Sequence, residues 1–360
     1  MAYTTIDDPS VYFQTALYTG DGASSNAITN GGNSDLQPDW LWIKNRSSSG
    51  GTGPNIIFDS TRGPTKDLHT NNSETEHTNS NTCKSFNTDG FTVGDSGAVN
   101  NNTDNFVAWQ WKANGGSRTT FSESGSNAGG GYQVNTTAGF SIIDYTGTGS
   151  AGATITHGLG ATPEFFVVKG RSIGDSWTSY HHKNTSAPET DMLKLDENGA
   201  TQDNVVFFND TAPTSTVFTV DGAGGESKVN QDGETYIAYC FRSIQGYSKI
   251  GSYTGNGNTD GTFVYTGFKP AWLLIKRTDS AKDWYLYDNK RNTFNRHDTV
   301  LVPNGSGADL TTDNYVDFLS NGFKLRGSSS VTNSNGGTYV YLAFAEHPFV
   351  SSEGVPTTAR

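Results

Sequence analysis

One pattern of hydrophobic and polar positions occurs three times along the chain. In each copy a proline is followed two residues later by an aromatic residue that opens four consecutive apolar positions, and a lysine closes the run. The copies are residues 38–44, 163–169 and 270–276. Proline is tolerated at the first residue of a strand, and a run that is apolar on both faces indicates a strand covered on both sides. The pattern therefore predicts three central strands within an internal repeat.

Shorter patterns accompany each copy in the same order. A strand that ends in a glycine turn precedes it and contains Tyr18, Tyr145 or Tyr253. A second aromatic run follows, at residues 55–59, 175–180 and 283–288. This run alternates more than the central one, so we expect strands with one solvated face.

The end of each copy is also patterned. Asp89-Gly90 and Asn321-Gly322 lie between short apolar runs, which is a strong hairpin signal. A last strand carries a small residue between bulky neighbours, and the alanines that align there are Ala108, Ala238 and Ala343. We interpret the small residue as a place where another element packs close to the backbone.

These patterns predict an all-β protein of three tandem antiparallel β-sandwich repeats. Only 17% of residues are charged and no window has a sustained helical period, which leaves little material for helices. The expected divisions are an N-terminal arm (1–11), the three repeats (12–113, 140–244 and 247–348), a Gly/Ser-rich linker (114–139) and a polar tail (349–360). Because the linker follows the first repeat, we expect the second and third repeats to move as a pair.

Charge and cysteine content exclude some classes of protein. A net charge of -12 argues against nucleic-acid binding, which needs clustered Lys and Arg. Cys83 and Cys240 fall at non-equivalent places in two repeats, which argues against a structural disulfide. The N-terminus has no basic and apolar leader, and no apolar run is long enough to span a membrane. We therefore expect synthesis in a cytoplasm without a signal peptide, and no membrane insertion.

Candidate chemistry is sparse. His181-His182, near Asp175 and Glu189, lacks a third ligand at fixed spacing, so a solvated strand end is favoured over a metal site. Residues 196–199 and 256–261 are oxygen-rich turns that do not fit the twelve-residue calcium loop. No nucleophile elbow, P-loop or zinc-protease motif occurs. We predict no catalytic residue, no cofactor and no metal, although a carboxylate pair assembled across strands would leave no motif.

Aromatic side chains on the second run are the better candidates for function. If alternate positions face outward, flat aromatic surfaces there suit sugar rings or partner chains. The candidates for surface or glycan contact are Trp177, Tyr180, Trp284, Tyr285 and Tyr287. The alternative is packing between repeats, which would bury the same residues.

Several segments of the first repeat resemble a family of virion structural proteins of tailed bacteriophages, especially those of marine bacteria. They are residues 1–15, 37–46, Phe58-Asp-Ser-Thr-Arg-Gly and Asp89-Gly-Phe-Thr-Val-Gly. The resemblance covers the first repeat almost throughout, is recognisable in the third and is loose in the second. It implies jelly-roll or lectin-like sandwiches similar to the concanavalin type, in tail fibres, receptor-binding proteins or head-decorating appendages.

The expected function is therefore a non-enzymatic virion structural protein, foremost a tail fibre or receptor-binding protein that attaches to a host surface, with a glycan as the expected receptor. The alternatives are a capsid-decorating or adaptor protein without receptor contact, and a surface-polysaccharide depolymerase. We expect the N-terminal arm, with Tyr3, Ile6 and Pro9, and the first repeat to dock on other virion proteins while the second and third repeats project. A homo-oligomer is expected, and a trimer on resemblance to phage fibres.

Overall fold

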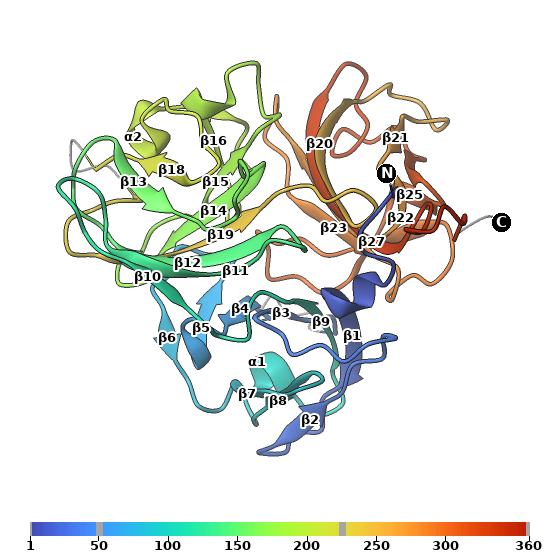
Figure 1. Ribbon diagram of the computed structural model, residues 1–360. Coiled ribbons are helices and arrows are strands. Elements are labelled where there is room, and N and C mark those ends of the chain that lie inside the picture. The colour runs from blue at the N-terminus through green and yellow to red at the C-terminus, as the bar shows by residue number, and fades with distance from the viewer. Residues whose placement is uncertain (1, 48–52, 223–227, 358–360) are drawn as a thin grey trace.

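The computed structural model describes residues 2–47, 53–222 and 228–357. It is nearly all β, with 43% strand and 4% helix, and its strands form several antiparallel sheets, which confirms the predicted fold class at that level. The sheets gather into three lobes around a common centre (Figure 1). Each lobe has two sheets that pack face to face in the manner of a sandwich, and in the first and second lobes one sheet is larger than the other.

The first lobe follows the N-terminal turn η1 (Pro9–Val11) and also holds the short helix α1 (Gly97–Asn100). Its large sheet has the order β1 (Phe13–Thr19), β9 (Asn105–Trp111), β3 (Trp40–Asn45), β4 (Asn55–Asp59), β5 (Gly63–His69) and β6 (His77–Thr78). Its small sheet has the order β2 (Asn26–Ile28), β8 (Phe91–Val93) and β7 (Cys83–Phe86). The predicted Asp89-Gly90 hairpin joins β7 to β8.

The second lobe contains two short helical elements, η2 (Pro188–Thr190) and α2 (Val205–Phe208). Its large sheet has the order β10 (Thr119–Phe121), β11 (Gly130–Asn135), β12 (Phe140–Thr146), β19 (Thr235–Phe241), β14 (Phe165–Gly170), β15 (Thr178–His181), β16 (Asp191–Lys194) and β17 (Gln202–Asp203). The small sheet pairs β13 (Ala153–Thr156) with β18 (Val217–Val220).

The third lobe consists of two four-stranded sheets. The sheet that faces the centre has the order β20 (Ser248–Thr254), β27 (Thr338–Pro348), β22 (Phe268–Arg277) and β23 (Tyr285–Asp288). The outer sheet has the order β21 (Phe263–Tyr265), β26 (Gly322–Leu325), β25 (Leu310–Leu319) and β24 (His297–Val300). The predicted Asn321-Gly322 hairpin joins β25 to β26.

The three patterned runs form β3, β14 and β22, and each strand has a paired neighbour on both sides. Trp40 and Trp42 of β3 face the centre of the molecule, whereas Leu41 and Ile43 face the small sheet of their own lobe. The prediction of central strands covered on both faces is thus confirmed. In the third lobe the strand begins earlier, at Phe268, and Pro270 lies at a register irregularity, where a missing N–H is tolerated.

The alignment of the three alanines is wrong in the third lobe. Strand register pairs Ala108 with Ile43 and Ala238 with Val168, but the corresponding residue Ile275 pairs with Tyr341, not with Ala343. The small residue lies instead on the neighbouring strand, because Gly251 is opposite Tyr341. A Cβ atom on Gly251 would approach the Tyr341 hydroxyl to 2.7 Å.

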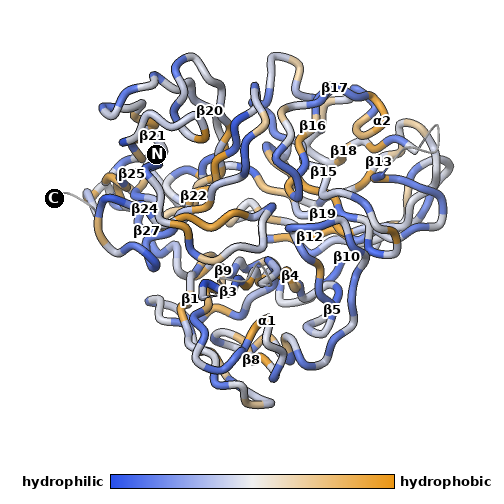
Figure 2. The backbone as a smooth tube through the Cα atoms, turned by 180° about the vertical axis from the view of Figure 1, so that it is seen from behind, coloured by the Kyte–Doolittle hydropathy of each residue, from blue (hydrophilic) through white to orange (hydrophobic). Residues whose placement is uncertain are grey.

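All three lobes share one aromatic core at the centre. Trp40 of the first lobe lies 4.9 Å from Tyr239 of the second between ring centroids, and Trp111 lies 5.5 Å from Trp272 of the third. Phe241 and Phe344 join the second lobe to the third at 5.8 Å. Hydrophobic stretches run along the strands inside the lobes and at their meeting point (Figure 2). The expectation that the second and third lobes form a pair apart from the first is therefore wrong.

Residues 114–139, expected to be a flexible linker, contain β10 and β11, which extend the large sheet of the second lobe. The glycines there allow close approach of strands: a Cβ on Gly130 would come within 2.1 Å of the Asp144 carbonyl oxygen. Composition alone suggested flexibility, whereas Gly129, Gly130 and Gly131 pack closely against neighbouring residues in or beside this sheet.

The N-terminal arm packs on its own chain. The Tyr3 hydroxyl donates to the Gly267 carbonyl oxygen at 2.8 Å, and the Thr4 hydroxyl donates to the Gln245 carbonyl oxygen at 2.8 Å. Ile6 is 3% exposed and belongs to the central core. Asp7 accepts a hydrogen bond from the Ser352 N–H at 2.7 Å, which ties the arm to the C-terminal tail. The arm's apolar residues thus pack against the rest of the chain.

Candidate functional site

The five aromatic side chains predicted to contact a ligand are buried. Each of Trp177, Tyr180, Trp284, Tyr285 and Tyr287 is at most 7% exposed. The expectation that alternate side chains of these strands face solvent is wrong. The alternative, packing between repeats, holds for Trp177 and Trp284 but not for the three tyrosines.

The reason is that the strands have two covered faces. Trp177 and Trp284 belong to the central core, while Tyr180 and the pair Tyr285 and Tyr287 lie in the sandwich cores of their lobes. One face of each strand is covered by residues of the other lobes. A local sequence pattern cannot reveal this contact.

Polar side chains at these strands connect the lobes in a cycle. Trp177 Nε1 donates to the His69 carbonyl oxygen of the first lobe at 2.7 Å, and Trp284 Nε1 donates to the Lys194 carbonyl oxygen of the second at 2.9 Å. Asn55 of the first lobe donates to the Val302 carbonyl oxygen of the third at 3.1 Å. These donors have an interlobe structural role.

The three pattern-closing lysines follow the same cycle. Their ammonium groups donate to loop carbonyl oxygens of a neighbouring lobe: Lys44 to Ser306 at 2.8 Å, Lys169 to Ser73 at 3.1 Å and Lys276 to Asn198 at 3.1 Å. Burial lowers the pKa of each lysine to about 8. These lysines therefore form buried hydrogen bonds that connect the lobes.

His181 and His182 do not form a ligand set. His181 lies 3.3 Å from the Tyr341 carbonyl oxygen through Nε2 and accepts from the Lys183 N–H through Nδ1, so both ring nitrogens have backbone partners. Burial lowers the pKa of His181 to about 3, which keeps it neutral. Asp175 pairs with Lys228 at 3.2 Å.

The oxygen atoms of the two oxygen-rich turns accept hydrogen bonds from nearby protein groups or form ion pairs with them. Asp196 accepts the Trp177 N–H at 2.9 Å, and Glu197 pairs with Lys194 at 2.8 Å. Asn256 accepts from the Asn258 N–H, as expected of an Asx turn.

An open depression of about 780 Å³ lies on the outer sheet of the third lobe. Tyr315 and Asp317 project from the outward face of β25, whereas Val316 and Phe318 between and after them enter the core. The other lining residues come from adjoining loops, the last of them directly after β26: Thr259, Asp260, Asn295, Arg296 and Arg326.

The charged groups of the depression hold one another in place. Lys324 pairs with Asp260 at 2.5 Å, and Arg326 pairs with Asp317 at 3.2 Å. The hydrogen bond from Lys324 lowers the pKa of the Asp260 carboxyl. The Arg296 guanidinium lies 3.8 Å from the centroid of the Tyr315 ring. The surface thus combines ion-paired hydrogen-bonding groups with an aromatic ring.

Two exposed aromatic residues lie near the depression in sequence or in strand register. Phe294, directly before Asn295, is 83% exposed, and Phe263, opposite Lys324 on the neighbouring strand, is 44% exposed. Sequence analysis missed both. The signal for Phe294 was its place in the polar segment 289–296, where no apolar periodicity requires a phenylalanine.

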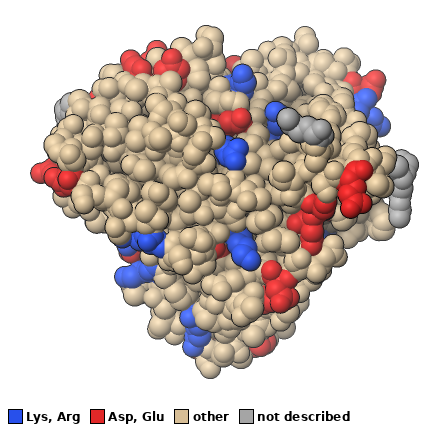
Figure 3. Space-filling model, in the orientation of Figure 1, with Lys and Arg blue, Asp and Glu red and all other residues tan. Residues whose placement is uncertain are grey.

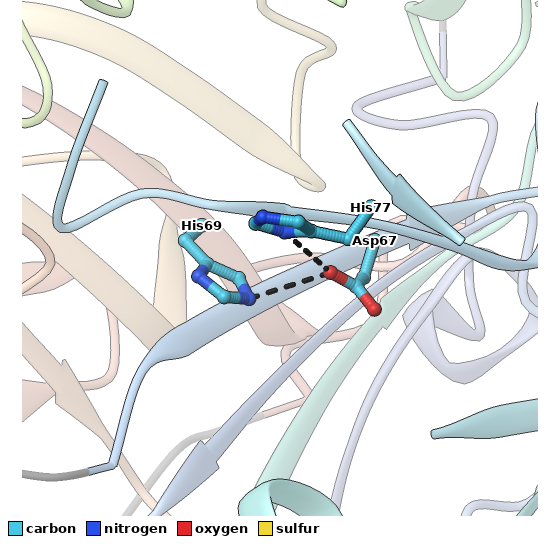
Figure 4. A group of neighbouring side chains, drawn as sticks. All are labelled: Asp67, His69 and His77. Atoms are coloured by element: carbon cyan, nitrogen blue, oxygen red, sulfur yellow. Dashed lines mark ion pairs between the residues drawn. The ribbon is translucent and has the colours of Figure 1, made fainter. Parts of the chain in front are cut away.

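Asp67, His69 and His77 form a cluster in the first lobe (Figure 4). Asp67 and His69 are two residues apart on β5, and His77 on β6 pairs opposite Asp67, so all three side chains lie on one face. Asp67 Oδ1 is 3.4 Å from His69 Nε2 and 3.3 Å from His77 Nδ1. The sequence prediction of no metal ligands did not consider these residues.

Charge is dispersed over the face of the molecule in Figure 3, with acidic and basic side chains interspersed among uncharged ones. Within the described part of the chain, no helix is long and apolar enough to cross a membrane. Cys83 and Cys240 are both buried and unpaired.

Together the sheets define an all-β, sandwich-like protein with an open polar and aromatic surface. The chain belongs to the family known as domain of unknown function DUF7483, whose model matches residues 8–348. Neither curated proteins nor solved structures give a match.

Proposed function

We propose that the chain is a non-enzymatic structural protein of a tailed-phage virion that binds a glycan on the host surface through the outer sheet of the third lobe. The virion setting is supported by the resemblance of the first-repeat segments to phage structural proteins. The binding role is supported by one observation above others, the depression whose lining residue Asn295 directly follows the exposed Phe294.

The chemistry of this surface suits a sugar. An exposed aromatic ring packs against the apolar face of a pyranose, while carboxylates and guanidinium groups bond its hydroxyls. Asp260, Arg296 and Arg326 supply such groups. Asp260 and Arg326 take part in ion pairs, and the Arg296 guanidinium lies over the Tyr315 ring. Pre-organised groups lose little conformational entropy on binding.

A binding role is favoured over polysaccharide cleavage. A carboxylic acid that protonates a leaving group needs a raised pKa. In the depression, the pKa of Asp260 is lowered instead. Burial raises the pKa of Asp39 and Asp196, but neither lines the depression.

We also propose that the three lobes are tandem repeats of one sandwich unit. Support comes from the shared strand order β1-β9-β3-β4, β12-β19-β14-β15 and β20-β27-β22-β23, and from the cyclic lysine contacts. This cyclic arrangement favours a second candidate function, a capsid-decorating or adaptor protein, because three similar faces match a threefold site on a particle. Attachment as a trimer and through the arm stays a prediction.

The test is binding of the purified full-length protein to host surface polysaccharide. We expect Phe294→Ala to weaken binding by about tenfold or more, since losing one stacking contact costs about 1.4 kcal/mol. Val205→Ala, which removes a 46%-exposed apolar side chain from the second lobe, is the matched control and should bind normally. Equal binding by wild type and Phe294→Ala would contradict this site. Absence of polysaccharide binding by wild type would favour the decorating or adaptor role.

A further inference from the structure

We propose that Asp67, His69 and His77 bind a divalent transition-metal ion of the zinc type, which braces the contact between the first and second lobes. This inference is independent of the proposed glycan site, which lies in another lobe.

The ligand atoms have the spacing that such an ion requires. Ligands at about 2.1 Å from a tetrahedral zinc are about 3.4 Å from one another. The two measured distances from Asp67 Oδ1 to the imidazole nitrogens are 3.4 and 3.3 Å. All three ligand atoms lie within 4.8 Å of one another, which lets one ion contact all three after side-chain adjustment.

The neighbours of the cluster suit its ligands. The second nitrogen of His69, Nδ1, is 3.5 Å from the Glu74 carboxylate, the arrangement that orients a metal-bound imidazole. The second oxygen of Asp67 accepts from the Thr82 hydroxyl at 3.4 Å. One aspartate and one nearby glutamate balance the charge of a divalent ion.

The donor set selects the class of metal. Two imidazoles and one carboxylate favour zinc, nickel or cobalt, whereas calcium and magnesium take oxygen ligands. The side chain of Asp67 is only 4% exposed, while that of His77 is 44% exposed. The open side at His77 leaves a coordination position for water.

The position of the cluster gives the ion a mechanical role. His69 and His77 lie at the two ends of the connection formed by residues 70–76, and a shared ion would join these ends. That connection meets the second lobe: Ser73 accepts from Lys169, and Glu76 pairs with Arg171 at 2.8 Å. The Glu76 N–H also donates to the Arg171 carbonyl oxygen at 2.8 Å. Fixing the connection therefore fixes the junction between the lobes.

Calorimetric titration of chelator-treated full-length protein with zinc chloride tests the site. We expect one zinc ion per chain and at least a tenfold weaker affinity in His77→Ala, which should fold because this side chain is half exposed. His347→Ala, an exposed histidine in the third lobe, is the control and should bind as wild type does. Calcium chloride should not displace zinc. No zinc uptake, or equal uptake by His77→Ala, would overturn the site.

Amide hydrogen exchange tests the brace separately. Zinc should slow exchange in residues 70–76 severalfold in wild type and leave His77→Ala unchanged. Stoichiometric binding with unaltered exchange in this connection would overturn the bracing role.

Discussion

At the scale of single residues, the lysines that close the three patterned runs have a role that their sequence position did not predict. The pattern indicated where a strand ends. The structure shows buried ammonium groups that donate to carbonyl oxygens of another lobe. Their lowered pKa values report the cost of holding a cation away from water.

This cost predicts a dependence of stability on pH. The pKa of Lys169 falls from 10.5 in the unfolded chain to about 8 in the folded protein, so unfolding takes up a proton between these values. The lysine contribution to the free energy of unfolding therefore rises with pH in that window, by up to about 1.4 kcal/mol per pH unit. Urea unfolding of wild type and Lys169→Met from pH 8 to 10 measures it.

The difference in unfolding free energy between wild type and Lys169→Met isolates the contribution of the lysine. Burial raises the pKa of Cys83, Cys240 and the core tyrosines, and these groups oppose the lysine in both proteins alike. Wild type should gain stability relative to Lys169→Met as the pH rises. Parallel curves would show that Lys169 keeps its ordinary pKa.

The sequence predicted the orientation of a side chain where local strand geometry determines it. The opposite faces of Trp42 and Ile43 follow from the two-residue period of a strand. The burial of Trp177 and Trp284 did not, since the surfaces that cover them belong to distant segments. The two-residue spacing of Asp67 and His69 can be seen in the sequence. The pairing of β5 with β6, which brings His77 opposite Asp67, cannot.

At the scale of elements, the strand pair β20 and β27 of the third lobe differs in residue size from the pair β1 and β9 of the first lobe. The first lobe places Ala16 opposite Ala108, whereas the third places Gly251 opposite Tyr341. The sequence pattern of a small residue between bulky neighbours pointed to Ala343 instead. The third lobe thus has a large residue on β27 and a small one opposite it on β20. This compensation is seen only when the pairing of the two strands is known.

This pair gives a testable coupling. Gly251→Ala should destabilise the protein by about 1–3 kcal/mol, because the new Cβ would meet the Tyr341 hydroxyl at 2.7 Å. In a Tyr341→Ala background the same change should cost little. Chemical unfolding of the four proteins in the cycle measures the coupling.

Gly307→Ala provides the control, since a Cβ there would have no neighbour within 4 Å. If Gly251→Ala costs the same with and without the tyrosine, the proposed packing of this pair is incorrect.

At the scale of the whole molecule, the three lobes are one packed body. The all-β class followed from composition and short patterned strands, but the shared core did not, because its aromatic residues are far apart in sequence. The same core explains the N-terminal arm, which had suggested an external partner.

The arm should therefore contribute to stability. Ile6→Ala removes a side chain that is 3% exposed in the central core and should cost about 2–4 kcal/mol in thermal or chemical unfolding. Asp7→Ala, at a solvent-exposed neighbour, should cost much less. Equal effects of the two substitutions would contradict packing of the arm.

The most direct test of the shared core is differential scanning calorimetry of the full chain. Because Trp40, Tyr239 and Trp272 belong to one aromatic cluster, the account predicts a single cooperative transition, with equal calorimetric and van't Hoff enthalpies. Two or more separate transitions, with the first lobe melting apart from the others, would contradict it.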